Sequence, residues 1–453
     1  MTQERVLKDN ASGGLVQALP KGGRVLLLQG PVGPFFRQLQ ASLEAQGHET
    51  WRVCFNAGDL LFAPRKRVIR FFGGKMEWQK WLEALLADGR FETLILFGSD
   101  RPAHRIAREV CKKLGVRVLA LEEGYIRPGY VTVEEGGNNA ASPLAGRLPP
   151  ADFVPQVPKP DVNGANFNRM CWLGGFYYTA RGLFGIGPQR ELYHRRMTLL
   201  MEILYWTRNA TRRIFNGERD FRRIERLLEH HDGRYYIVPL QVAADSNMGT
   251  AACGWNSARL IAELIPSFAR RAPAGTRLVF KTHPMERGHN SLTPLILDTA
   301  AACGVADRVD VIDTGSLGLL ARHSAGMITI NSTSGLSAIS HGCRLMVLGK
   351  AIYAHPALAT CAQGQPDFDD WWSGGHVARP ELRRTFLAWL KTEALVPGDF
   401  YSRAGIETAC SSVARVLNDG PRIDMPVLRP TMDYEKPAAR AAAEYQMPRK
   451  VGT

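Results

Sequence analysis

The sequence predicts an α/β fold with two Rossmann-like domains. Short apolar segments alternate with amphipathic ones, and this alternation occurs in two separate series. A chain of 453 residues with 45% hydrophobic residues is also long enough to form more than one core. The longest apolar runs, such as "VLLL" and "LAWL", fall far short of the roughly 20 residues that cross a bilayer.

The first series lies within the first 125 residues. The expected strands are the apolar segments at 24–30, 50–56, 92–98 and 116–124. Between them, segments with helical periodicity occupy 35–47, 77–88 and 104–115. Strands that alternate with helices of this length are typical of a parallel sheet wound by helices. We therefore predict an N-terminal Rossmann-like domain over residues 1–150.

The pattern changes between residues 151 and 233 to a proline-broken loop followed by arginine-rich helix. Eleven arginines and five acidic residues lie between Arg181 and Arg226, interleaved with aromatic residues and leucine. Such a segment is suited to docking on anionic lipid headgroups. It is equally typical of an interdomain helix whose arginines are solvated. We predict a basic helical connector and leave both interpretations open.

The second series predicts a C-terminal Rossmann-like domain over residues 234–420. Its expected strands are 235–241, 277–284, 309–313, 326–332 and 344–349, with helical segments between them. Residues 421–453, rich in proline, alanine and charge, are expected to form a partly disordered tail. Two such domains describe the architecture of GT-B glycosyltransferases, in which ligands bind between the carboxyl ends of the two sheets.

The composition limits the classes of molecule that the protein is expected to bind. The formal net charge of +14 favours an anionic partner, either nucleic acid, a phospholipid surface or a phosphorylated small molecule. No RNA-binding motif or zinc finger is evident, which disfavours nucleic acid. The eight cysteines are scattered singly, as expected for reduced thiols, and "MTQERVLKDN" lacks the pattern of a secretion signal. We therefore expect a cytoplasmic protein.

Charged residues gather where the last strand of the first series ends, in "LEEGYIRPGYVTVEEGGNN". Glu122 and Glu123 follow an apolar run, and Arg127 comes shortly after. If the strand continues through both glutamates, their side chains point to opposite sides and only one faces the ligand. The later pair, Glu134 and Glu135, is predicted to lie in a solvated loop.

Two other strand ends carry candidate ligand groups. Backbone amides at Gly30 and Gly33 are placed to face a ligand, although a plain strand-to-helix turn is the stronger interpretation. In "KTHP", Lys281 and His283, followed by Pro284, are suited to contact a phosphate leaving group, offsetting its charge and offering it a proton, so His283 is also a candidate catalytic residue. A histidine at a strand end is nevertheless more often structural.

The remaining candidates follow two further strands. "NSTSG" places hydroxyls and free amides at a helix N-terminus, which attracts phosphate, although simple N-capping explains a single serine equally well. "LQVAADS" offers a candidate nucleophile or base, or a loop-capping aspartate. The residues concerned are Asn331, Ser332, Ser334, Gly335, Gln241 and Asp245. The acidic "PDFDDWW" follows no clear strand end, so we predict a solvated loop and no metal site.

Taken together, these segments resemble one family. The matching blocks are "LQGPVGPFF", "FGSDRPAHRIA", "EEGYIRPGYVTVEEGGNN", "PLQVAADSNM", "KTHPMERG", "NSTSGLSAISHG" and "VLGKAIYAHPALA", in this order, over residues 25–358. They are similar to the capsule polysaccharide biosynthesis and export proteins of the KpsS/LipB type, which are bacterial retaining β-Kdo transferases. The "EEGYIRP" block is the most specific of them.

The resemblance implies a reaction. The enzyme would move Kdo (3-deoxy-D-manno-octulosonic acid) from CMP-Kdo to a phosphatidylglycerol-type lipid, starting the linker that carries the capsule chain. Donor and product are both β-linked in the family, so configuration is retained, most simply through a covalent glycosyl-enzyme intermediate. The implied location is the inner membrane surface, to which the enzyme would attach peripherally. Its partners would be CMP-Kdo and an anionic phospholipid, with other capsule proteins as possible partners. No nucleic acid would bind.

The resemblance also implies residue roles. Asp245 resembles the family nucleophile, and Glu123, with Glu122 as the alternative, is expected to be the acid/base. Arg127 would bind the sugar carboxylate, since its fork matches a carboxylate. Lys281 and His283 would meet the CMP phosphate, and Ser332 and Ser334 would share that phosphate or the ribose. No cofactor or divalent cation is then required.

Two alternatives belong to other classes. A nucleotide-sugar epimerase also pairs two Rossmann-like domains, and it would act without a lipid acceptor. A non-catalytic assembly factor would bind capsule lipid and recruit the exporter. Clustered ionisable groups at strand ends disfavour this last alternative.

Overall fold

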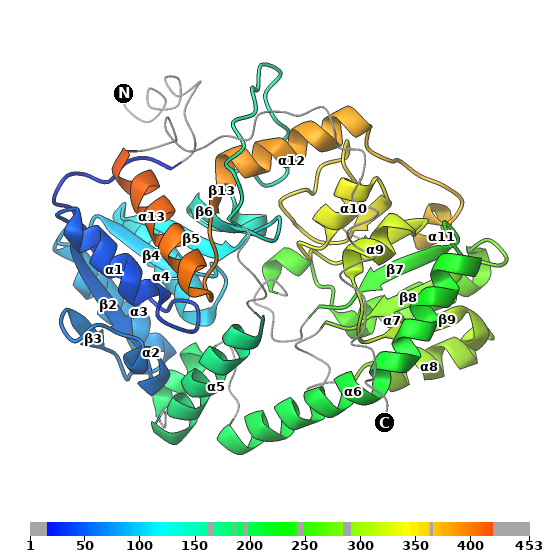
Figure 1. The fold of residues 1–453 in the computed structure, drawn as a ribbon, viewed down its shortest axis with the longest axis horizontal. Coiled ribbons are helices and arrows are strands. Elements are labelled where there is room, and N and C mark those ends of the chain that lie inside the picture. The colour runs from blue at the N-terminus through cyan, green and yellow to red at the C-terminus, as the bar shows by residue number, and fades with distance from the viewer. Residues whose placement is uncertain are drawn as a thin grey trace, which may run out of the picture.

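The computed structural model describes residues 16–161, 167–184, 187–193, 198–241, 249–283, 291–362 and 366–419. Two α/β domains lie side by side, each built on one sheet with helices against its faces (Figure 1). The predicted fold class, α/β with two Rossmann-like domains, is therefore confirmed.

The first domain contains a seven-stranded sheet in the order β13-β6-β5-β4-β1-β2-β3. Strands β1 to β5 are parallel, whereas β6 is antiparallel to both β5 and β13. The inner strands are continuous apolar runs because helices cover both of their faces. The strand bounds are β1 Arg24–Leu27, β2 Glu49–Cys54, β3 Val68–Arg70, β4 Thr93–Phe97, β5 Arg117–Glu123, β6 Tyr130–Glu135 and β13 Leu395–Pro397.

The helices of this domain form where the sequence predicts them, with one addition, the short α2. Local signals set their ends: α4 begins with a proline in its first turn and ends at Gly115, which has the left-handed φ of 70°. Trp78 of α3 is fully buried and its indole N–H donates to the carbonyl of Ala103. The bounds are α1 Phe35–Ala45, α2 Ala57–Leu61, α3 Lys75–Ala87 and α4 Pro102–Leu114.

The second domain contains a six-stranded parallel sheet in the order β12-β11-β10-β7-β8-β9. Its strands are β7 Tyr235–Pro239, β8 Arg277–Lys281, β9 Val309–Ile312, β10 Gly326–Thr329, β11 Arg344–Val347 and β12 Thr360–Cys361. Its helices are α7 Ser257–Arg271, α8 Thr293–Ala302, α9 Leu317–Arg322, α10 Gly335–His341, α11 Phe368–Trp371 and α12 Pro380–Ala394. The five predicted strands are all present.

The C-terminal part of the described chain returns to the first domain. After α12, which runs along the upper edge of the molecule in Figure 1, β13 pairs with β6 and α13 (Arg403–Asp419) packs on α1. Phe400, for example, lies edge-on against Phe35, with ring centroids 4.7 Å apart. The predicted domain boundary of 234–420 is therefore wrong at its C-terminal end, because the order of elements along a chain does not reveal such a crossover. The predicted tail, 421–453, lies outside the described residues.

The predicted connector divides between the two domains. Helix α5 (Phe167–Phe184) packs on the first domain, and the second half of α6 (Leu199–His230) packs on the second, with Leu227 fully buried. Both helices lie along the lower edge of Figure 1. Within the described ranges, no helix combines the length and the apolar character needed to cross a bilayer.

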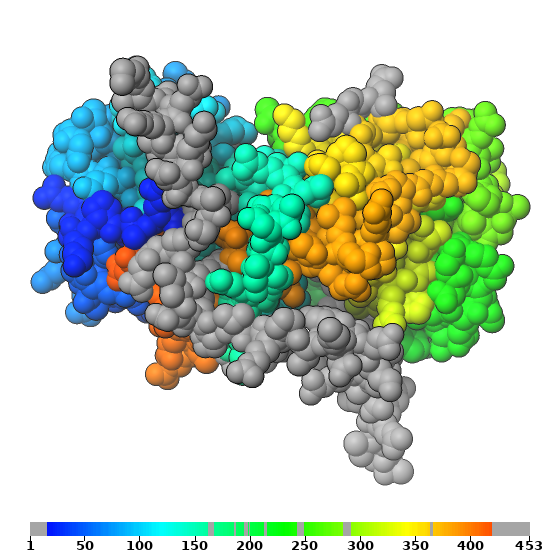
Figure 2. Space-filling model, turned by 90° about the horizontal axis from the view of Figure 1, so that it is seen from above, coloured from blue at the N-terminus to red at the C-terminus, as the bar shows by residue number. Residues whose placement is uncertain are grey.

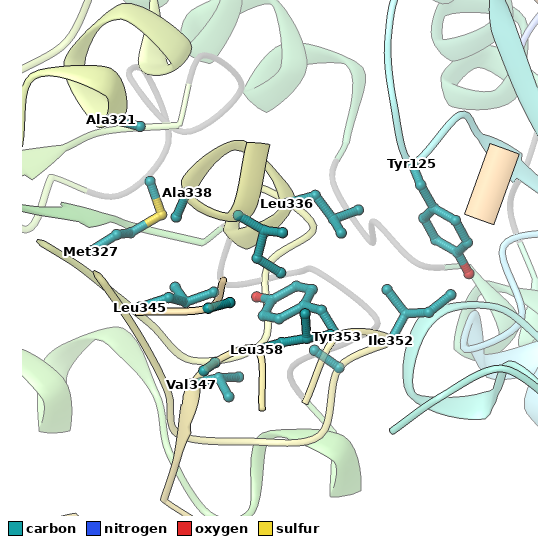
Figure 3. Close-up of a cluster of buried hydrophobic side chains, with 14 of the residues drawn as sticks. Tyr125, Ala321, Met327, Leu336, Ala338, Leu345, Val347, Ile352, Tyr353 and Leu358 are labelled. Atoms are coloured by element: carbon teal, nitrogen blue, oxygen red, sulfur yellow. The ribbon is translucent and has the colours of Figure 1, made fainter. Parts of the chain in front are cut away.

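The domains also meet on the opposite edge. Residues 142–161 lie beside α12 between the two lobes, as Figure 2 shows from above, and the backbone N–H of Gln156 donates to the Thr392 hydroxyl over 3.1 Å. One hydrophobic cluster spans the boundary, since it includes Tyr125 of the first domain and Ile352 of the second, both labelled in Figure 3. Leu144 of the first domain belongs to the same cluster. The strand ends that carry the candidate site are thus held by packing on both sides.

Candidate functional site

Strand β5 continues through both glutamates of the "EEGYIRP" block. Glu122 pairs with Thr132 and Glu123 with Val131 of β6. The Glu123 Oε1 accepts a hydrogen bond of 2.7 Å from the hydroxyl of Tyr401, in the segment that follows β13. The Glu122 carboxylate instead extends toward Gly98, after β4. The two carboxylates therefore have different neighbours, as strand alternation requires.

Arg127 lies close to the Glu123 carboxylate. Its Nε donates to the carbonyl of Gly124 over 3.1 Å, and one of its terminal nitrogens lies 3.9 Å from Glu123 Oε2. The Arg127 side chain is 59% exposed. Because a separation of 3.9 Å is long for an ion pair, this guanidinium keeps much of its capacity to bind another anion.

The second glutamate pair corrects the sequence analysis. Glu134 lies in β6, 2% exposed, and not in a solvated loop. Its Oε2 accepts from the Tyr125 hydroxyl over 2.5 Å and from the Asn138 amide over 3.4 Å, and its Oε1 accepts from the Ser142 hydroxyl over 2.5 Å. Burial raises the pKa of Glu134 to about 7, against the opposing effect of these hydrogen bonds. Glu135, only partly buried, pairs with Arg117 over 2.6 Å.

Asn139 extends the Glu134 network into the second domain. Its backbone N–H donates to the Tyr125 hydroxyl over 2.5 Å, while its side chain donates to the carbonyl of Asn331 over 3.1 Å and accepts from the N–H of Ile352 over 3.0 Å. Its φ of 51° is one that asparagine adopts more readily than most residues. The only local signal for this contact in the sequence is the pattern "GGNN".

On the second domain, Asn331 and Gln241 are buried against each other. The Gln241 amide donates to Asn331 Oδ1 over 2.8 Å, and the Asn331 N–H donates to Gln241 Oε1 over 3.1 Å. These two predicted binding residues therefore join the ends of β7 and β10 to each other. Through Asn139 they are also joined to the first domain.

The predicted serine cluster precedes α10. The Ser332 hydroxyl oxygen accepts from the N–H of Ser334 over 3.2 Å and from its hydroxyl over 2.8 Å. Ser334 occupies the N-cap position but makes no side-chain cap hydrogen bond. Gly335 is required by packing, because a Cβ there would lie 2.2 Å from the Tyr353 hydroxyl. The structure brings these residues together next to Asn331.

Lys281 ends β8 and is 6% exposed. Its ammonium donates to the carbonyl oxygens of Thr282 over 3.3 Å and Asp313 over 3.4 Å. His283 is exposed two residues beyond. Pro284 and Asp245, the predicted nucleophile, lie outside the described residues, so their positions relative to Glu123 stay predictions.

The glycine turn after β1 is closely packed. Gly33 has a φ of 110°, and a Cβ there would lie 2.9 Å from Leu173 of α5. The carbonyl of Gly30 accepts from Arg101, whose guanidinium also donates to Gln29 Oε1 over 3.1 Å. Arg101 is thus a further cation at the strand ends; it was not among the predicted site residues, although its segment, "GSDRP", belongs to a matching block.

The acidic segment near α11 is not a solvated loop throughout. Asp367 caps α11, and Asp369 accepts from Ser267 and pairs with Arg270 and Arg271. The Asp369 carboxylate is therefore bound by side chains of helix α7. Among the described residues, no three histidine, cysteine, aspartate or glutamate side chains gather as a metal site would require.

Sequence comparison identifies the family. A family model described as "Capsule polysaccharide biosynthesis protein" matches residues 92–401. The "Capsule polysaccharide export protein KpsS" of Escherichia coli is 33% identical over 395 residues, which cover 86% of this chain and 100% of that protein. The "Capsule polysaccharide modification protein LipB" of Neisseria meningitidis serogroup B is 31% identical over 420 residues, covering 88% of this chain and 96% of the relative.

Solved structures resemble the chain more distantly. The β-Kdo 2,7 transferase of Thermosulfurimonas dismutans KpsC matches with a TM-score of 0.41 and 15% identity, over 87% of this chain and 99% of that one. This likeness is too weak to assign chemistry, so the assignment rests on the sequence relatives. On that basis, the chain belongs to the capsule polysaccharide biosynthesis protein family, together with KpsS and LipB.

Proposed function

We propose that this protein transfers Kdo from CMP-Kdo to a phosphatidylglycerol-type lipid with retention of configuration, and so initiates the β-Kdo linker of a capsular polysaccharide. Family membership supports a role in capsule biosynthesis or export. The observation that carries the proposal is the tip of β5, where the Glu123 carboxylate is held by Tyr401 beside the exposed Arg127 guanidinium. A carboxylate with a neighbouring exposed cation suits a sugar that itself carries a carboxylate.

The proposed reaction has two displacements. Asp245 attacks the anomeric carbon of the donor, the bond to CMP breaks, and the Kdo ring becomes covalently bound to the enzyme. The lipid hydroxyl then attacks the same carbon as Glu123 accepts its proton, and Asp245 leaves as a free carboxylate. Two inversions give net retention. Glu122, which extends toward Gly98, is the alternative acid/base.

The remaining groups have binding roles in this proposal. Arg127 pairs with the Kdo carboxylate, and Lys281 and His283 neutralise the phosphate of CMP as it departs. The hydroxyl groups of Ser332 and Ser334 share that phosphate or the ribose. Because the leaving group is a monophosphate met by these cations, we propose that neither a metal ion nor a cofactor is needed. The enzyme would work at the inner face of the cytoplasmic membrane without spanning it.

Intact-protein mass spectrometry tests the proposal directly. Incubation with CMP-Kdo and no acceptor is expected to add one Kdo mass to the protein. The adduct should be absent from Asp245→Asn and should persist in Glu123→Gln when acceptor lipid is added. If wild-type protein gave no adduct while still making lipid-linked Kdo, a direct front-side displacement would replace the double displacement.

The alternatives give different outcomes in a second assay. An epimerase would convert the nucleotide sugar equally well with and without phosphatidylglycerol, whereas the proposed enzyme requires the lipid to form a lipid-linked product. A non-catalytic assembly factor would support normal capsule initiation with Asp245 replaced by asparagine and the fold intact.

A further inference from the structure

Helix α5 buries polar side chains and exposes apolar ones. Tyr177 and Arg181 lie on the buried side, together with Gly174. The outer side carries Trp172 and Phe184, which are 72% and 75% exposed, and the residues between them on that side are mostly apolar as well. An ordinary surface helix buries its apolar stripe and exposes its polar one, so this arrangement needs an explanation beyond folding.

Hydrogen bonds and an ion pair fix the polar side of α5 inward. The Tyr177 hydroxyl donates to Asp59, which is 1% exposed, over 2.9 Å. Arg181 pairs with Glu202 of α6 over 3.3 Å, with both side chains 4% exposed. Rotating α5 to hide Trp172 would expose and separate these groups and leave a buried carboxylate without its partner, at a cost of several kcal/mol. The apolar outer face is therefore enforced by the fold.

The first three turns of α6 continue the same face. Glu202 and Asn209 lie inward, while the apolar side chains of the first two turns point outward. Figure 1 shows α5 and the start of α6 along one edge of the molecule. We define the lipid face by the exposed apolar side chains of these two segments: Phe167, Trp172, Phe176, Leu183, Phe184, Leu200, Met201, Ile203 and Leu204.

The sequence of this region is strongly basic. From residue 167 to 217 the sequence contains eight arginines and two glutamates, with no aspartate or lysine. One of the glutamates, Glu202, is buried in the ion pair with Arg181. Arg169 and Arg208 are both exposed on the helices that carry the lipid face. Exposed arginines beside an exposed aromatic and aliphatic face complement the anionic headgroups and acyl chains of a bilayer.

We propose that the lipid face docks the protein on an anionic phospholipid bilayer, with α5 and the first turns of α6 lying in the plane of the headgroups. Its purpose rests on the proposed function, since the acceptor would be a lipid in that bilayer. Helix α5 also contacts the candidate site, because Leu173 fills the space beside Gly33 at the end of β1. Docking therefore places the membrane surface next to the strand ends.

Vesicle sedimentation tests the surface. Wild-type protein is expected to bind vesicles of phosphatidylglycerol and phosphatidylcholine, and to bind at least tenfold more weakly when the vesicles contain phosphatidylcholine alone or when salt is raised to 1 M. The double variant Trp172→Glu/Leu204→Glu should bind the anionic vesicles at least tenfold more weakly than wild type. Both side chains are more than 60% exposed, so the fold should tolerate the change.

A matched control separates the face from exposed apolar groups in general. Val154 is 71% exposed and belongs to the segment beside α12, on the opposite edge of the molecule. Val154→Glu should bind vesicles as wild type does. Equal vesicle binding by wild type and the double variant would overturn the proposal. The proposal would also be overturned if the wild-type protein did not bind vesicles but self-associated through Leu204. The lipid face would then be a contact between two copies of the protein.

The design also separates this proposal from the proposed function. With a short-chain phosphatidylglycerol dispersed as monomers, the double variant should form lipid-linked Kdo at the wild-type rate, whereas with vesicles its rate should fall with its binding. Tight vesicle binding without any transfer to either acceptor would contradict the proposed function and leave the docking surface standing. Transfer to monomeric lipid without vesicle binding would contradict the docking surface and leave the proposed function standing.

Discussion

Two pairs of adjacent glutamates end neighbouring strands of one sheet, yet their environments differ completely. Glu122 and Glu123 end β5 as partly exposed groups, the second beside Arg127. Glu134 and Glu135 end β6, and the first of them is buried with three hydrogen-bond donors around its carboxyl group. The residue types and the antiparallel pairing are the same. The environments differ because different segments of the protein pack against each pair.

Residues 138–142 cover Glu134 and supply two of its donors, whereas the tip of β5 meets the side chains of Tyr401 and Arg127. A carboxyl group enclosed by hydroxyls and amides, without a cation, is held in its neutral form at mildly acidic pH. The Glu123 carboxylate, in contrast, is only partly buried and lies beside an exposed guanidinium, so a ligand can reach it. One pair is thus suited to joining the domains, and the other to reacting.

The largest effect is expected at the β5 pair. Glu123→Gln should lower the rate of Kdo transfer by about 10²- to 10⁴-fold, as removal of a general acid/base does, with the free energy of unfolding little changed. Initial rates with CMP-Kdo and saturating lipid measure this. Glu122→Gln is the matched control, and a larger loss from Glu122→Gln than from Glu123→Gln would exchange the two roles.

At the β6 pair, a substitution should lower the stability of the fold. Glu134→Ala leaves the Tyr125 and Ser142 hydroxyls and the Asn138 amide without their acceptor and opens a cavity. Together these effects should lower the free energy of unfolding by about 4 kcal/mol. Urea unfolding at pH 6 measures it. A change below about 1 kcal/mol would mean that water replaces the carboxyl group without penalty.

The same residue should give stability a pH dependence. Because the pKa of Glu134 is raised from 4.5 to about 7, the folded protein holds a proton that the unfolded chain has released between these values. The free energy of unfolding should therefore fall as pH rises from 4.5 to 7, by on the order of 3 kcal/mol in all, and this contribution should level off above pH 7. Glu134→Gln, which resembles the neutral form, should remove this slope in urea unfolding measured at several pH values. An unchanged slope would assign it to other groups.

The contrast also shows what could be predicted from the sequence. Inner strands such as β4 were predicted because a parallel strand buried on both faces must be a continuous apolar run. Strand β6 was missed because it ends in two glutamates, and β13 because three residues give no pattern. Strand β13 forms because a distant strand, β6, pairs with it, whereas β6 forms a hairpin with its neighbour β5.

The candidate site divides in a similar way. The order of strands and helices predicted candidate residues at the carboxyl ends of strands, and of these Asn331 contacts the other domain through Asn139. Their partners could not be predicted. Asn331, for example, pairs with Gln241, because buried polar groups must be satisfied by whatever the fold brings near them. A list of residue types at strand ends cannot separate such structural pairs from groups that meet substrate.

The smallest effect is expected at Glu135, which shares its position with Glu134 in sequence but not in environment. Its carboxylate pairs with Arg117 over 2.6 Å, and it is only partly buried, so water screens much of the attraction. Glu135→Gln should lower the free energy of unfolding by less than about 1 kcal/mol and leave the pH slope assigned to Glu134 intact. Urea unfolding at pH 6 and pH 8 checks both points. A loss comparable to that of Glu134→Ala would show that the ion pair at the start of β5 holds the hairpin together, and that burial of Glu134 is not what distinguishes the two pairs.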